Sequence, residues 1–300
     1  MSRMDLTIWV LGALVALSSI SFGAYYYYDR YGHASQGVVG HQIQNIEGMV
    51  RENPNSAELR VAAANFYLEG GQTDQAIQQS QQALAVNSNN QDALVILGRA
   101  YEKAGNLQNA IDSLKQVVEL NKDNPLAKID PRLEMVNYEL GTLYAKQNKY
   151  DEAVASFKLA LDINKTDADA HFALGVVYQK RNEHANAVSE FQEAVRYIPD
   201  FAEAYDGLAV SQAALGKQPE AKYARAMVQL LQGQAGNAAS QLEEVIAQSP
   251  NAKYAYFGLG LAYEKLGKRD QAIQAIREYM KTNPNDIAAQ QALGRLSRGK

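Results

Sequence analysis

Two patterns of hydrophobic and polar positions divide the sequence. Residues 6–28, LTIWVLGALVALSSISFGAYYYY, carry no charged side chain, whereas from residue 57 onward apolar residues recur periodically among polar ones. The first pattern is typical of a helix that is apolar all round, and the second of amphipathic helices that bury one face. The chain is therefore expected to begin with one apolar helix and to continue as a long array of amphipathic helices.

The apolar segment is long enough to cross a membrane. A helix over Leu6–Tyr28 would be about 34 Å long, and a bilayer core is about 30 Å thick. Trp9 near one end and Tyr25 to Tyr28 at the other suit the two interfaces. We expect an uncleaved transmembrane anchor, with a signal peptide cleaved after Ser21 as the alternative. The five-residue tail before the segment favours a soluble region on the extracytoplasmic side of a single-pass membrane protein.

The periodic region repeats every 34 residues. Four repeats, 91–124, 134–167, 168–201 and 253–286, share Leu-Gly, a Tyr three residues after that Gly, and an Ala nine residues after the Tyr. A weaker repeat, 57–90, keeps Ala64, Tyr67, Ala76 and Ala83. A small residue at the eighth position and Ala at the twentieth allow two helices to approach closely, while the Tyr at the eleventh fills the gap between repeats.

These positions resemble the signature of the tetratricopeptide-repeat (TPR) family, over residues 57 to about 296. The resemblance implies an all-α, right-handed α-solenoid of helix–turn–helix repeats, to which the sequence adds one N-terminal transmembrane helix. No repeat can bury its apolar face alone, so neighbouring repeats must stack. The expected organisation is an anchor over 1–28, a tether over 29–56 and a TPR solenoid over 57–300.

Three stretches depart from this pattern. The first half of the tether reads as flexible because of its glycines, and Ile43, Ile46 and Val50 could mark a short amphipathic helix. Residues 125–133 are an insertion in which Asp130-Pro131 suggests an N-cap followed by Pro at the first helical position. Residues 202–252 span one and a half periods, and their middle helix can pair either way. The stretch 287–297 is expected to be a capping helix.

Candidate chemistry is sparse. With a net charge of −4, the chain has no basic excess for binding a phosphate backbone, so nucleic acid is not expected as a partner. There is no cysteine, and His33, His41, His171 and His184 are too scattered to suggest a metal site. No Gly-x-Ser-x-Gly elbow or Gly-rich phosphate loop occurs. We therefore expect neither an enzyme nor a cofactor or metal.

The resemblance also implies a binding surface, because TPR proteins usually hold partners in a concave groove lined by first helices. Family members that bind chaperone tails carry a charged clamp at these positions, and this sequence lacks it. The corresponding positions here are largely apolar and aromatic. We expect an amphipathic helix or apolar peptide to dock on this strip, with Tyr138 and Phe172 as anchors. The predicted groove residues are Asn65, Val95, Ile96, Arg99, Tyr138, Thr142, Phe172, Val176, Phe257 and Leu261.

The expected function follows from the anchor and the groove together. It is a membrane-anchored protein-interaction scaffold or assembly factor. Two alternatives are a structural subunit of a membrane protein complex, which small residues Gly12, Ala16 and Ser19 of the anchor would suit, and a chaperone-like holder of translocated proteins.

Overall fold

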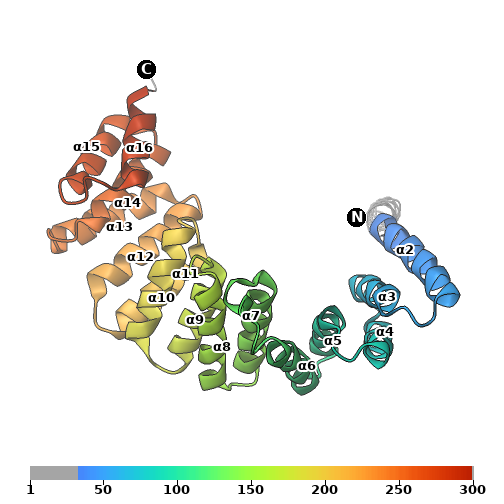
Figure 1. Ribbon diagram of the computed structural model, residues 1–300. Coiled ribbons are helices and arrows are strands. Elements are labelled where there is room, and N and C mark those ends of the chain that lie inside the picture. The colour runs from blue at the N-terminus through green and yellow to red at the C-terminus, as the bar shows by residue number, and fades with distance from the viewer. Residues whose placement is uncertain (1–32, 299–300) are drawn as a thin grey trace, which may run out of the picture. The chain divides into compact units, whose positions relative to one another are not determined.

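The computed structural model describes residues 33–298 of the chain, and every regular element in that range is helical (Figure 1). It divides into two compact parts, one ending at Lys122 and the other beginning at Asp123. The N-terminal part holds α2 (His33–Glu52), α3 (Ala57–Glu69), α4 (Thr73–Val86), α5 (Gln91–Lys103) and α6 (Leu107–Leu120). The C-terminal part begins with the short 3₁₀ helix η2 (Ala127–Ile129) and α7 (Pro131–Lys146). It continues with α8 (Tyr150–Ile163), α9 (Ala168–Lys180), α10 (His184–Tyr197), α11 (Ala202–Ala214), α12 (Gln218–Leu231), α13 (Ala235–Gln248), α14 (Tyr254–Lys265), α15 (Arg269–Met280) and α16 (Ile287–Arg298).

The predicted transmembrane helix, residues 6–28, lies outside the described residues. Between residues 33 and 298, no helix is both long enough and apolar enough to cross a bilayer.

Where the sequence suggested a flexible tether, the structure differs from residue 33 onward. A single 20-residue helix, α2, covers this stretch and packs against α3. Ile43 and Ile46 are buried in one core with Ala63 and Tyr67 of α3. A glycine inside a helix costs about 1 kcal/mol relative to alanine, but burial of an apolar helix face offsets such a cost. The spacing of Ile43 and Ile46 thus indicates the helix correctly, whereas the glycines of this stretch do not indicate a flexible segment.

The small residues at the eighth position of each repeat allow its two helices to pack closely, as predicted. A Cβ atom added at Gly141 of α7 would lie 2.8 Å from the ring of Phe157 on α8, and one at Gly175 of α9 would lie 2.8 Å from Phe191 on α10. Real Cβ atoms do not come this close to other heavy atoms, because protein interiors are already close-packed. Glycine at these sites is thus required by the neighbouring aromatic ring.

The turn between first and second helix has a constant backbone feature. In each such turn one residue adopts a left-handed conformation, with φ between 58° and 81°. Glycine takes this conformation freely, and asparagine is the residue that most often replaces it. The seven residues are Gly71, Gly105, Asn148, Asn182, Gly216, Gly233 and Gly267.

The irregular span 202–252 contains three helices, α11, α12 and α13. Each of the two turns inside this span contains a left-handed glycine, as do the turns between a first and a second helix. These glycines, Gly216 and Gly233, are only 17 residues apart. Ala221 and Ala226, on α12, are both fully buried. Helix α12 packs against α11 and α13, so it is the second helix of one pair and the first helix of the next.

This extra half repeat changes which layer the first helices occupy. Before it, first helices contact each other as α7 with α9 and α9 with α11; after it, the contacts run from α12 to α14 and from α14 to α16. Successive helices alternate between two layers, so the row of first helices passes from the layer of α11 to the layer of α12. The C-terminal part therefore has two rows of first helices, α7–α9–α11 and α12–α14–α16.

The insertion before α7 ends as the sequence suggested. The Asp130 side chain accepts a hydrogen bond of 2.8 Å from the backbone N–H of Arg132, and Pro131 opens the helix. The last helix, α16, extends over the stretch expected to form a cap, and a Cβ atom added at its Gly294 would meet no atom of the described residues within 4 Å.

Candidate partner-binding surface

In the N-terminal part, the predicted groove residues differ in how much of them a partner could reach. Val95 and Ile96 are only 6% and 8% exposed, because α5 is surrounded by α3, α4 and α6. Asn65 and Arg99 are partly exposed, and the Asn65 amide donates to the Glu69 carboxylate at 2.7 Å. Of these four predicted residues, Asn65 and Arg99 are therefore accessible, whereas Val95 and Ile96 are core residues.

In the C-terminal part, Tyr138 and Thr142 of α7 are half-buried. The Tyr138 ring meets Phe157 edge-on at 5.6 Å, and the Thr142 hydroxyl donates to the Tyr138 carbonyl at 3.1 Å. Burial, followed by the charges of Asp169 and Asp167, raises the pKa of Tyr138 above its ordinary value. The tyrosine has a packing role and still presents an uncharged face.

The next helices of this row frame a hollow. Phe172 and Val176 of α9, both predicted, lie in a concavity of about 600 Å³ that also involves α10, α11 and α12. The Phe172 ring packs against Phe191 at 5.8 Å and Phe201 at 4.9 Å. The other lining residues are Gln179, Phe191, Ala202, Glu203, Asp206, Gly207, Val210, Val228 and Gln232.

The walls of this hollow are held in place by hydrogen bonds and close packing. The Gln179 amide donates to the Gly207 carbonyl at 2.9 Å and to the Ser211 hydroxyl at 2.7 Å, which ties α9 to α11. A Cβ atom at Gly207 would lie 2.5 Å from the Phe191 ring, so the backbone of α11 rests directly on that ring. The surface is thus formed before any partner arrives.

The hollow is apolar inside and acidic at its rim. Val210, one of several large apolar side chains that are exposed in the described residues, is 51% exposed and lines this hollow. Glu203 and Asp206 are exposed, and neither forms an ion pair with another residue in the range 33–298. The site can therefore take an apolar side chain together with a nearby positive charge.

Sequence reasoning missed Glu203, Asp206, Val210 and Val228. The first three are the second, fifth and ninth residues of α11, and the predicted Phe172 and Val176 are likewise the fifth and ninth residues of α9. The position within the helix therefore indicated these residues, but the irregular repeat length of residues 202–252 concealed them. Val228 could not be found in this way, because α12 reaches the hollow only through the half repeat.

The predicted strip is not one surface in the C-terminal part. Phe257 and Leu261 lie on α14, which belongs to the second row of first helices. The Phe257 ring stacks on Tyr279 of α15 at 5.2 Å, and neither Phe257 nor Leu261 lines the hollow. The half repeat separates these two residues from Tyr138 and Phe172.

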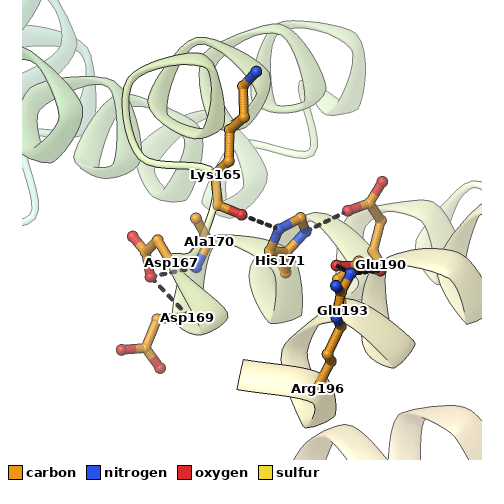
Figure 2. Close-up of polar contacts among 8 residues, drawn as sticks. All are labelled: Lys165, Asp167, Asp169, Ala170, His171, Glu190, Glu193 and Arg196. Atoms are coloured by element: carbon orange, nitrogen blue, oxygen red, sulfur yellow. Dashed lines mark hydrogen bonds and ion pairs between the residues drawn. The ribbon is translucent and has the colours of Figure 1, made fainter. Parts of the chain in front are cut away.

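His171 of α9 forms hydrogen bonds to two neighbouring segments of the chain (Figure 2). The His171 Nδ1 lies 2.7 Å from a carboxylate oxygen of Glu190 on α10, and its Nε2 lies 3.2 Å from the Lys165 carbonyl oxygen. Burial would lower the pKa of His171, but these two hydrogen bonds and the charges of Glu190 and Glu193 outweigh it and raise the pKa. The protonated ring can donate to both oxygens, whereas the neutral ring has one N–H.

This cluster has a structural role. Nowhere in residues 33–298 do three or more His, Asp or Glu side chains come together in a way that could hold a metal ion. His171 instead joins α9, α10 and the turn after α8, and so stabilises the helix that carries Phe172.

Comparison with known families agrees with this architecture. Models of the tetratricopeptide repeat match residues 61–125, 141–181, 168–201 and 229–296. The chain belongs to the tetratricopeptide-repeat family. Proteins of this class generally act as interaction scaffolds without enzymatic activity. None of the curated proteins matches the sequence.

Several solved TPR structures share the fold. MamA is 25% identical, with a TM-score of 0.52, over 58% of this chain and 96% of its own. YrrB, described as a TPR protein with an unusual peptide-binding site, is 19% identical, with a TM-score of 0.51, over 70% of this chain and 95% of its own. The C-terminal part of a TPR protein from Cytophaga hutchinsonii is 16% identical, with a TM-score of 0.56, over 86% of this chain and 96% of its own.

Proposed function

We propose that this protein is a membrane-anchored interaction scaffold that holds a segment of a partner protein in the hollow formed by α9 to α12. The observation that carries the proposal is the exposed apolar surface of Val210 inside a preformed concavity. Monomeric proteins seldom leave such a hollow uncovered unless it binds something. That YrrB has a peptide-binding site supports a peptide as the occupant, since the two proteins share a fold.

The anchor part of the proposal rests on the sequence of residues 6–28. An uncharged segment of this length with aromatic residues at both ends supports a transmembrane helix. We place the TPR region on the extracytoplasmic side. A fusion at Lys300 to a reporter that is active only outside the cytoplasm tests this, and activity of a cytoplasmic reporter instead would reverse the assignment.

The occupant of the hollow should combine an apolar side chain with a lysine or arginine. The apolar group would rest on Phe172, Val176 and Val210, and the cation would lie near Glu203 and Asp206. Charge pairs at the edge of an interface mainly select the partner and speed its association, while the buried apolar contact contributes most of the affinity.

The test compares two substitutions that introduce the same charge. Val210→Glu places a carboxylate inside the hollow, and Leu159→Glu places one on α8, where Leu159 is similarly exposed at 49%. Each full-length variant is purified in mild detergent, and copurifying proteins are quantified by mass spectrometry. We expect Val210→Glu to lose partners that Leu159→Glu retains, and identical partner profiles would refute a role for the hollow.

The same experiment separates the scaffold from a permanent structural subunit. A subunit held by its transmembrane helix would keep its partners in both variants and lose them when Gly12 and Ala16 are replaced by leucine. A chaperone-like holder would copurify many unrelated clients rather than a defined set.

A further inference from the structure

Charge is unevenly distributed along the C-terminal part. Residues 123–252 contain 12 basic and 18 acidic side chains, whereas residues 253–298 contain 8 basic and 4 acidic ones. The last three helices are thus basic in a chain that is acidic elsewhere. Such asymmetry is a physical argument about partners rather than about the fold.

Five of these basic residues lie at the C-terminal ends of α14 and α16 or at the start of α15. Two contacts bring the ends of these helices together: the Arg295 guanidinium binds the Glu264 carboxylate at 2.9 and 3.1 Å, and Arg269 Nε donates to the Leu296 carbonyl at 2.6 Å. We call this surface the basic edge; its residues are Lys265, Lys268, Arg269, Arg295 and Arg298.

Part of this charge has a structural use. Basic side chains near helix C-termini compensate the negative ends of the helices. Arg269 does this for α16, Arg295 is paired with Glu264, and Lys268 lies over the Tyr263 ring at 5.5 Å. Lys265 and Arg298 are exposed and have no hydrogen-bond or ion-pair partner within residues 33–298. Both lie in the last turn of their helices, where their charge also compensates the negative helix end. Because no specific partner holds either side chain, we call them the surplus cations.

A hollow of mixed lining, with leucines beside Gln234 and Asn237, adjoins the basic edge. Its volume is about 450 Å³, and it lies between the turn from α12 to α13 and the C-terminal end of α14. Lys265 lines it together with Leu231 and Leu266, which are 37% and 39% exposed. A surplus cation thus stands directly beside exposed leucine side chains.

We infer that the basic edge docks an acidic segment of a partner protein, with carboxylates near Lys265 and Arg298 and one apolar side chain in the hollow beside Leu231 and Leu266. A flat anionic membrane surface fits less well, because the leucines line a concavity and cannot insert into lipid. This surface lies outside the hollow of α9 to α12 and has the opposite charge preference, so it does not depend on the function proposed above.

The test uses the full-length protein in mild detergent and two synthetic probes. One probe is a fluorescent 12-residue peptide that contains four glutamates and three leucines, and the other replaces the glutamates by lysines. Binding is measured by fluorescence anisotropy for the native chain, for Lys265→Glu with Arg298→Glu, and for Lys149→Glu with Lys158→Glu. The last pair changes the net charge equally, at two exposed lysines beside and on α8.

We expect saturable binding of the acidic peptide, weakened about tenfold by the Lys265→Glu, Arg298→Glu pair and less than about twofold by the α8 pair. Added salt should weaken binding, because exposed charges are screened, and the lysine peptide should not bind. Circular dichroism confirms that the variants remain folded.

Three results would overturn the inference. Equal weakening by both pairs would mean that only overall charge matters. Absence of binding by the acidic peptide, combined with charge-dependent binding to vesicles of phosphatidylserine in phosphatidylcholine, would assign the edge to a membrane surface. Absence of binding to either probe and to the vesicles would show that the surplus cations serve no docking role.

Discussion

Gly260 and Gly294 offer a direct test of how the repeats pack. They are 34 residues apart and occupy the same position in successive first helices, α14 and α16. A Cβ atom at Gly260 would lie 2.4 Å from Ile276 Cγ1 and 3.2 Å from the Ala272 carbonyl oxygen, whereas nothing lies within 4 Å of one at Gly294. The same substitution, glycine to alanine, therefore meets a full core in one place and open space in the other.

The two effects can be estimated separately. Overpacking a core costs roughly 1–3 kcal/mol, and Gly260→Ala should lie at the upper end because Ile276 is fully buried and cannot move aside. Replacing a helical glycine by alanine contributes up to about 1 kcal/mol of stability. We therefore expect Gly260→Ala to destabilise the last repeats by about 2 kcal/mol and Gly294→Ala to stabilise them by up to about 1 kcal/mol.

Hydrogen exchange of the α14 to α16 amides is the appropriate assay. Repeat arrays open locally, so exchange resolved by helix locates the effect at one interface, whereas an unfolding midpoint reports only the net change in stability. Gly260→Ala should increase exchange in α14 and α15, and Gly294→Ala should slow it in α16. Equal exchange in the two variants would refute the close packing of α14 on α15, as would a Gly260→Ala protein that is more stable than the native chain.

Two further predictions concern stability. Because the pKa of His171 is raised in the folded protein, its contribution is fully present below the unfolded pKa of about 6.5 and is lost as the pH rises through the folded value. His171→Gln should therefore lower the urea midpoint more at pH 5.5 than at pH 8.5, and an equal loss at both pH values would exclude the His171–Glu190 pair as the cause. Gly216→Ala and Gly233→Ala should each lower the free energy of unfolding by about 1–2 kcal/mol, because alanine is strained in the left-handed region. The control is Gly40→Ala in α2, where a Cβ atom meets nothing within 4 Å. It should not lower the free energy of unfolding in the same urea titration.

Much of the fold could be read from the sequence, because the repeat signature encodes contacts that recur in every repeat. Gly141 and Gly175 are glycines because Phe157 and Phe191 lie against them, and the repeat signature located both glycines. The role of α12 could not be read in the same way. Its sequence offers a buried alanine for either pairing, Ala221 or Ala226, and the structure uses both.

The candidate site was predicted less completely, since exposure depends on every neighbouring helix rather than on position in the repeat. Val95 and Phe172 are both the fifth residue of their first helices, yet Val95 is covered by surrounding helices and Phe172 lines an open hollow. The basic edge was outside sequence reasoning for a similar reason. Lys265 and Arg298 are 33 residues apart in the chain, and only the packing of α16 on α14 relates them.

The dual role of α12 has a consequence for how such a protein could be lengthened. Insertion of a complete 34-residue repeat adds two helices, so every later helix would stay in its own layer. Insertion or removal of a 17-residue half, ending at a left-handed glycine such as Gly216, exchanges the layers of everything that follows. A stretch about the length of one helix and its turn is thus enough to move the first helices of all later repeats to the other layer, while the contacts within each later repeat stay the same.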